Sequence, residues 1–276
     1  MVSYELPQDF GEFERAGWED PGIVVNYDRH ISCVTIQAID ALLDSVRTAE
    51  GDRLLDVATG AGYMVDAAAR RGIEAIGVDF SAAQVRLARA RFPNHRFQQA
   101  DAMALPFERS YFHAVVNAFG ICHLFDPDLA LREAFRVLRP RGRIAFAVYD
   151  VPERAVALGA VYAAVRNHGT MDIGLPAGPD FFSFSDPTRS TDALLRAGFV
   201  DPVVRQIPQI WRISDSDELL EAIALGSVRG GAMLRAQRAE QMEAIKLGLR
   251  KDLAGYKRGE AFEVPAPAVV ATAVKP

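Results

Sequence analysis

Short apolar runs alternate with amphipathic segments through the middle of the chain, which predicts strands separated by helices. The clearest run is Leu54-Leu55-Asp56-Val57, which is typical of a buried strand and stops at a glycine-containing turn. Strands joined by crossover helices favour a doubly wound parallel sheet with helices on both faces. The predicted strands are 53–58, 73–79, 95–99, 113–118 and 143–149, and the predicted helices are 62–71, 81–91 and 127–138.

The pattern differs on either side of this region. The first 50 residues carry a broad apolar stripe at helical spacing between Ile31 and Val46, which either packs on the sheet or forms a lid. After Asp150 we predict helix 152–168, a loop near 174–184, helix 188–197, a strand over 202–210 interrupted by Pro208, a helical segment over 214–256 broken near Gly230-Gly231, and a strand over 268–274. The predicted domains are a helical cap (1–50), a ligand-binding core (51–150), its remainder with a loop insertion (151–210), a helical lid (211–262) and a final core strand (263–276).

Composition narrows the function classes. The chain has 276 residues, half of them hydrophobic, and a net charge of −5, which disfavours nucleic acid as a partner. Two cysteines, Cys33 and Cys122, are too few for a disulfide framework or a metal site and fit a reducing compartment. No run approaches transmembrane length, and Met1–Phe10 lacks the apolar stretch of a leader. We therefore expect a cytoplasmic protein without a membrane span or a metal.

Acidic residues follow three neighbouring predicted strands. Asp56 lies in the first strand, just before Gly60 and Gly62, while Asp79 and Asp101 end the second and third. In open α/β sheets, ligands bind beyond the carboxyl ends of the strands. Asp79 is placed to accept hydrogen bonds from a ribose, Asp101 from an exocyclic adenine amine, and Asp56 from an ammonium group. Each acid can also serve as a turn or helix-cap residue, because Asp favours both positions.

Five segments in this order make the chain resemble the class I S-adenosylmethionine-dependent methyltransferases, and especially the small-molecule branch that includes the ubiquinone/menaquinone C-methyltransferases. The segments are LLDVATGAGY, AIGVDFSAAQVRLARARFP, FQQADAMALPF, HAVVNAFGICHL and LREAFRVLRPRGRIAFAVYD. The resemblance runs from about Tyr27 to Tyr149. It implies a seven-stranded, mostly parallel sheet whose last strand is antiparallel, S-adenosylmethionine as cofactor and S-adenosylhomocysteine as product.

The resemblance also implies a set of site residues. Those expected to bind the cofactor are Tyr27, Asp56, Ala58, Gly60, Gly62, Asp79, Phe80, Gln84, Asp101, Ala102, Met103, Asn117, Ala118 and Phe119. Among these, Asn117 and Phe119 are expected beneath the reactive sulfonium. Methyl transfer needs a general base only when the nucleophile is neutral. The candidates are His123 at the expected substrate mouth, which can also be a capping residue, and Tyr27 and His30 in the N-terminal helix.

Three positions depart from the family pattern. Ala58-Thr59-Gly60 stands where the family often has Gly-Cys-Gly, and alanine is small enough to keep the close approach. His113 replaces an aspartate at the start of the fourth strand, where we expect it to support the strand. Arg141 replaces the first of two glycines before the fifth strand, which destabilises the turn if its φ is positive.

Two alternatives use the same glycine turn. A nicotinamide-dependent oxidoreductase needs a third glycine three residues after Gly62, where Val65 stands, and gives no role to Asp101. A non-catalytic member of the fold would bind a metabolite without transferring a methyl group. We expect the substrate to be a small hydrophobic or aromatic molecule methylated at O, C or N, and the protein to be a monomer or homodimer.

Overall fold

The computed structural model describes residues 9–276. The expectation that Met1–Phe10 carries no leader therefore lies almost wholly outside the described residues. Contacts within the chain divide it into two compact units. Unit 1 contains the described residues up to Val34 together with Asp150–Gly178 and Pro208–Pro267, and unit 2 contains Thr35–Tyr149, Pro179–Ile207 and Ala268–Pro276. The domain boundaries given above stay a prediction.

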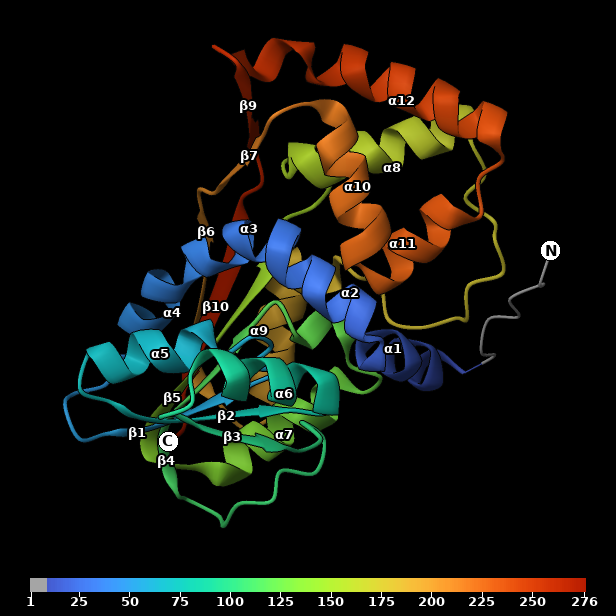
Figure 1. Cartoon of the computed structure of the whole chain (residues 1–276). Coiled ribbons are helices and arrows are strands. Elements are labelled where there is room, and N and C mark those ends of the chain that lie inside the picture. The colour runs from blue at the N-terminus through green and yellow to red at the C-terminus, as the bar shows by residue number, and fades with distance from the viewer. Residues whose placement is uncertain (1–8) are drawn as a thin grey trace. The chain divides into compact units, whose positions relative to one another are not determined.

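Unit 2 is built on a seven-stranded sheet with the order β3-β2-β1-β4-β5-β10-β6 (Figure 1). Neighbours from β3 to β5 are parallel, whereas β10 is antiparallel to both β5 and β6. This confirms the predicted mostly parallel sheet with an antiparallel last strand. The strands are β1 (Arg53–Val57), β2 (Glu74–Asp79), β3 (Arg96–Gln99), β4 (Phe112–Ala118), β5 (Leu138–Tyr149), β6 (Val200–Ile207) and β10 (Ala268–Val274).

Helices cover both faces of this sheet. Their apolar residues pack on alternate strand residues, with α5 and α6 on one face and α7 and α9 on the other. Polar side chains cap the N-termini of several of these helices. At the start of α6 (Ala82–Arg91), for example, the Ser81 Oγ accepts the Gln84 N–H. The helices are α4 (Ile39–Val46), α5 (Tyr63–Arg70), α6 (Ala82–Arg91), α7 (Pro127–Val137) and α9 (Pro187–Arg196), with short 3-10 turns at Ile36–Ala38, Ile121–His123 and Ser183–Ser185.

The order of strands fixes where a ligand can bind. The chain runs outward from β1 to β2 and β3, then returns to place β4 on the other side of β1. The crevice at such a reversal, outside the carboxyl ends of the strands, is the usual ligand site of open α/β sheets. In unit 2 this crevice lies between the turn after β1 and the turn after β4.

Unit 1 contains a helical group and a second sheet that the hydrophobic pattern did not predict. The sheet is antiparallel with the order β7-β9-β8. Its strands are β7 (Ile210–Ile213), β8 (Lys257–Arg258) and β9 (Ala261–Pro265). The helices are α1 (Phe10–Glu19), α2 (Pro21–Asn26), a π-helical turn (Tyr27–Ile31), α3 (Ser32–Thr35, which crosses the boundary between the units), α8 (Val156–His168), α10 (Ser216–Gly226), α11 (Val228–Arg235), α12 (Ala239–Leu253) and a 3-10 turn (Ala254–Tyr256).

Several predicted boundaries were wrong. The segment 214–256 breaks at Ser227, whose Oγ accepts the Gly231 N–H, and again after Arg235, so Gly230-Gly231 lies inside α11. The predicted strand 202–210 is two strands, because Pro208 ends the pairing of β6 before β7 begins. Helix 152–168 begins only at Val156.

The strand predicted from residue 143 begins five residues earlier, at Leu138. The pairing of β5 with β4 shifts register between Phe112 and Ala114. Such an irregularity is a place where a sheet tolerates a proline, and β5 contains Pro140. Among residues 9–276, no helix is long and apolar enough to cross a membrane.

Candidate functional site

Asp56 is the most unusual titratable residue in unit 2. It lies in β1 with 1% of its surface exposed, and its Oδ2 accepts the Thr59 hydroxyl at 2.6 Å. Its Oδ1 is buried and has no hydrogen-bond partner among the described residues. The pKa of Asp56 is raised to about 7, chiefly by burial. The hydrogen bond from Thr59 lowers this pKa, and the nearby charge of Asp79 raises it. Because a buried acceptor is normally paired, this oxygen fits a site for a donor group from a ligand.

Asp79 links the ends of β1 and β2. Its Oδ2 accepts the Gly60 N–H and its Oδ1 accepts the Ser81 N–H, both at 3.0 Å. The two φ angles of Gly60 and Gly62 are positive, a conformation that glycine adopts easily. Asp79 therefore shapes the glycine turn by accepting from backbone groups at the ends of both strands, and its expected contact with a ribose stays a prediction.

Asn117 connects the ends of β4 and β1. Its Nδ2 donates to the Val57 carbonyl at 2.9 Å, while its Oδ1 accepts the N–H groups of Gly120 and Ile121 at 3.0 and 2.8 Å. These contacts occupy its carboxamide with backbone groups. Asn117 thus holds the two turns together, and its predicted role as a cofactor contact stays a prediction.

The remaining predicted residues of unit 2 lie around the same strand ends. The Asp101 Oδ1 accepts the Met103 N–H at 2.8 Å, and the Gln99 Nε2 donates to the Phe80 carbonyl at 2.8 Å. The Gln84 Oε1 lies 3.9 Å from the position of a Cβ on Gly60, so its buried side chain approaches the glycine turn. The structure thus brings the predicted acids and turn residues to one edge of the sheet.

Aromatic side chains gather beyond β4 and β5. The Phe119 ring lies 4.6 Å from the Tyr149 ring, which stacks on Phe181 at 6.2 Å, and Phe181 lies 5.5 Å from His123, all measured between centroids. Phe182 packs edge-on against Phe181. His123 ends a 3-10 turn, and its backbone N–H donates to the Gly120 carbonyl. The candidate base thus lies next to an aromatic group within unit 2.

Tyr27 and His30 belong to unit 1 and lie in the π-helical turn Tyr27–Ile31. The Tyr27 ring packs edge-on against Trp18 at 5.4 Å, and its backbone lies against Gly226. Their roles as cofactor contact and candidate base stay predictions.

His113 has the supporting position expected of it. Its Nδ1 accepts the Arg53 N–H at 3.0 Å, which leaves the proton on Nε2, 3.0 Å from the Asp52 Oδ1. Burial lowers its pKa, so the ring is neutral and ties the starts of β1 and β4. This edge of the sheet is opposite to the acidic site.

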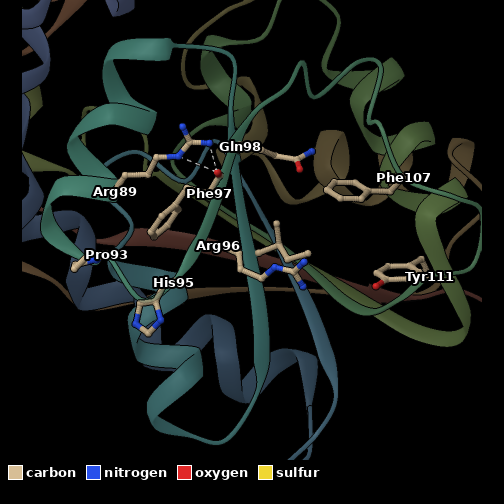
Figure 2. Close-up of a pocket in the computed structure, with 9 residues that line it drawn as sticks. Arg89, Pro93, His95, Arg96, Phe97, Gln98, Phe107 and Tyr111 are labelled. Atoms are coloured by element: carbon tan, nitrogen blue, oxygen red, sulfur yellow. Dashed lines mark hydrogen bonds between the residues drawn. The ribbon is translucent and has the colours of Figure 1, made fainter.

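An open groove of about 590 Å³ lies beside the edge strand β3 (Figure 2). It exists because a loop, not a helix, connects β3 to β4. Arg89 donates two hydrogen bonds to the Phe97 carbonyl there, at 3.1 and 2.7 Å. None of the predicted site residues lines this groove. Its lining residues are Ile76, Arg89, Pro93, His95, Arg96, Phe97, Gln98, Phe107 and Tyr111. This groove is therefore not the site that the sequence predicted.

Two contributing residues were not predicted. Thr59 holds the Asp56 carboxylate, and Gly77 leaves the space for Thr59, since a Cβ on Gly77 would lie 2.5 Å from the Thr59 Oγ1. The signal for Thr59 was its spacing of three residues from Asp56, as in a hydroxyl-capped turn. The role of Gly77 could not be read from the sequence, because it depends on the register of β1 and β2, in which Gly77 pairs with Asp56.

Residues 55–146 match the family model described as a methyltransferase domain. A demethylmenaquinone methyltransferase of Thermus thermophilus is 40% identical over 116 residues, covering 40% of this chain and 52% of that protein. A ubiquinone/menaquinone biosynthesis C-methyltransferase of Edwardsiella ictaluri is 35% identical over 142 residues, covering 48% of this chain and 56% of that protein. The matches thus span about half the length of these curated relatives.

Solved structures extend the likeness in fold. A phosphoethanolamine N-methyltransferase of Haemonchus contortus, in complex with phosphomonomethylethanolamine and S-adenosylhomocysteine, has a TM-score of 0.59 and 18% identity, covering 97% of this chain and 60% of that one. The YcgJ protein of Bacillus subtilis has a TM-score of 0.57 and 20% identity, covering 87% of this chain and 98% of that one. This chain is thus similar over residues 55–146 to a methyltransferase domain, and the curated relatives named above are methyltransferases.

Proposed function

We propose that this protein transfers a methyl group from S-adenosylmethionine to an O, C or N atom of a small hydrophobic or aromatic metabolite. The observation that carries the proposal is the buried Asp56 Oδ1, which has no hydrogen-bond partner within residues 9–276 and lies beside a glycine turn that Asp79 shapes. A ligand with an ammonium group and a ribose satisfies both acids at once. The names of the relatives, which include demethylmenaquinone methyltransferases, support the same chemistry.

The strand ends would hold the cofactor in the following way. Asp56 would receive the ammonium group beside Ala58, Gly60 and Gly62, and Asp79 would accept from the ribose. Asp101 would accept from the adenine amine, with Phe80, Gln84, Ala102 and Met103 around the base. Phe119 and Ala118 would lie near the sulfonium.

The chain's own part in the reaction is alignment. When bound, S-adenosylmethionine supplies a methyl group on a positively charged sulfur, so no further activation of the donor is needed. The turns after β1 and β4 hold the donor in line with the acceptor and exclude water. One bond forms between the acceptor and the methyl carbon while the carbon–sulfur bond breaks, and its electron pair stays on sulfur. A neutral acceptor also loses a proton, for which His123, Tyr27 and His30 are the candidates.

The aromatic residues near His123 best fit a methyl acceptor that contains an apolar ring. Phe119, Tyr149 and Phe181 form an aromatic surface next to His123. Such surfaces bind planar apolar ligands through stacked or edge-on ring contacts.

We infer that the protein works in the cytoplasm as a monomer or homodimer.

The cofactor assignment is tested by titration calorimetry with S-adenosylhomocysteine and, separately, NAD. We expect the first to bind and the second not to bind. Asp79→Ala removes hydrogen bonds to a charged acceptor worth about 1.5–3 kcal/mol each, so affinity should fall roughly 10- to 100-fold for each bond lost. Glu74→Ala is the matched control, because Glu74 is exposed at the other end of the same strand. Unchanged affinity of the Asp79 variant would contradict the ribose assignment.

A second candidate is cofactor binding without methyl transfer. One fold neighbour, described as the [4+2]-cyclase SpnF, has a TM-score of 0.50 and 20% identity, so this fold accompanies other named activities. A screen with methyl-labelled donor against small phenols, keto acids and isoprenoid quinols separates the two. Donor binding with no labelled product from any class would favour the second candidate.

A further inference from the structure

The turns after β1 and β4 are in direct contact at two small residues, Ala58 and Gly120. A Cβ built on Gly120 would fall well inside van der Waals contact with the Ala58 Cβ, and 2.9 Å from the Asn117 Nδ2. The Ala58 Cβ has no side-chain rotation with which to move away. Only one methyl group therefore fits between the two turns.

The backbone makes this arrangement unusual. Ala58 has φ +58°, in the left-handed region that favours glycine, whereas the φ of Gly120 is −88° and suits any residue. By backbone conformation alone, alanine belongs at 120 and glycine at 58. Gly120 is thus required by space and not by conformation, since Ala58 already fills the gap.

Asn117 fixes the two turns at this spacing. It donates to the Val57 carbonyl, immediately before Ala58, and accepts the Gly120 N–H. Phe119, between these contacts, is also left-handed at φ +60° and buried against Tyr149. A change in the separation of the turns would therefore reach the loop that carries Phe119.

We propose that Ala58 and Gly120 form a spacer pair, whose single methyl group sets the separation of the two turns and thereby positions the donor sulfonium. The two are positioning residues and not catalytic ones. This inference rests on the proposed function, because the sulfonium is assigned to the crevice between these turns. It also explains how alanine is accommodated at position 58, where related methyltransferases often have glycine.

The test moves the methyl group from one residue to the other. Gly120→Ala should weaken S-adenosylhomocysteine binding roughly tenfold or more, because two methyl groups cannot share the gap. Ala58→Gly leaves no methyl group between the turns, so they can approach each other and affinity should fall about three- to tenfold. The double variant A58G/G120A restores one methyl group and should recover affinity to within about threefold of the wild type. The Cβ at position 120 also lies 2.9 Å from the Asn117 Nδ2, so this recovery requires a small shift of the Asn117 side chain.

Gly142→Ala is the matched control at the other edge of the sheet. Its Cβ would lie 2.8 Å from the Arg139 carbonyl oxygen and 2.9 Å from the Leu138 Cδ2. This variant should lose stability in urea unfolding, with affinity per folded molecule retained, and A58G should not rescue it. A thermodynamic cycle of A58G and G120A in urea should show coupling, whereas the cycle of A58G and G142A should be additive.

The outcomes separate the two proposals. If G120A keeps wild-type affinity and stability, or if the double variant is no better than G120A, the spacer pair is wrong. If stability couples in the cycle but affinity does not recover, the pair spaces the turns without positioning the donor, and the functional inference is overturned. If the wild type binds neither donor nor product, the proposed function fails, while the urea cycle still decides the packing claim.

Discussion

Asp56 illustrates how an ordinary residue acquires unusual chemistry from its surroundings. Its carboxylate loses contact with water and gains one hydroxyl donor from Thr59, while its other oxygen has no hydrogen-bond partner in the part of the chain that the structure describes. These conditions raise the pKa of Asp56 to about 7. An ammonium group placed at the free oxygen would favour the charged carboxylate and lower that pKa again.

This residue makes cofactor affinity depend on pH. Below about pH 7 the Asp56 carboxyl holds a proton that a bound ammonium group would displace. We expect S-adenosylhomocysteine affinity to rise by up to about tenfold per pH unit from pH 5.5 to 7 and then to level off. Asp56→Asn should bind more weakly above pH 7 and lose this slope. Calorimetry at several pH values measures both, and an unchanged slope in the variant would place the proton elsewhere.

His123 makes a second prediction at the residue scale. If its imidazole is the general base, His123→Ala should reduce kcat by about 10²–10⁴ and leave cofactor affinity unchanged. The measurement uses the acceptor identified in the methyl-labelling screen, with affinity determined in parallel. His95→Ala is the control, because His95 lies 3.2 Å from Asp66 just before β3, away from the strand ends that carry the site. Loss of affinity with kcat retained would instead make His123 structural.

At the scale of elements, the turn inside β5 carries a residue unsuited to its backbone. Arg141 has φ +63°, and its N–H donates to the Lys275 carbonyl at 2.9 Å. The sequence predicted a destabilised turn if this φ proved positive, which it is. A left-handed conformation costs a residue with a Cβ about 1–2 kcal/mol, and glycine loses part of that advantage through its more flexible unfolded chain.

Arg141→Gly should therefore stabilise the protein by about 0.5–1 kcal/mol in urea unfolding, since it relieves the strain and keeps the backbone hydrogen bond. Arg132→Gly is the matched control, because Arg132 lies inside α7. Glycine there should destabilise by about 1 kcal/mol relative to a good helix former. Equal effects of the two substitutions would show that the φ of Arg141 is not a source of strain.

For the whole molecule, the burial of Asp56 links stability to pH. Its pKa is raised in the folded state, so between about pH 4 and 7 the folded protein keeps a proton that the unfolded chain has released. By linkage, this group makes the free energy of unfolding fall as the pH rises through that window. The slope from one such group is at most about 1.4 kcal/mol per pH unit.

The expected outcome is a pH-dependent difference between the wild type and Asp56→Asn in the absence of ligand. The variant should gain stability relative to the wild type from pH 4.5 to 7, with little further change above pH 8. Urea unfolding at each pH gives this difference directly, and the other titrating groups cancel in it. A difference that is constant with pH would mean that Asp56 is ionised in the folded protein at pH 5.

The alternation of apolar strands and amphipathic helices predicted a doubly wound parallel sheet, because the core strands are mostly apolar and the crossover helices have one apolar face. The seven strands and the antiparallel last strand followed from the resemblance to the methyltransferases. The alternation also predicted that Asp56, Asp79 and Asp101 meet at one edge, since parallel strands end together. The sheet β7-β9-β8 was missed, because β7 and β9 pair residues about 50 positions apart, which no local pattern records, and β8 has only two residues.

Only the tertiary structure decided what each residue does at that edge. Burial, which depends on the packed helices, gave Asp56 its raised pKa and its unpaired oxygen. The Asn117 side chain connects two turns by hydrogen bonds, and Gly120 packs against Ala58, because strands separated by 60 residues in sequence are neighbours in the sheet. The sequence alone determined which chemical groups arrive at the site, through strand order and period, whereas contact and desolvation between distant segments determined their protonation and their spacing.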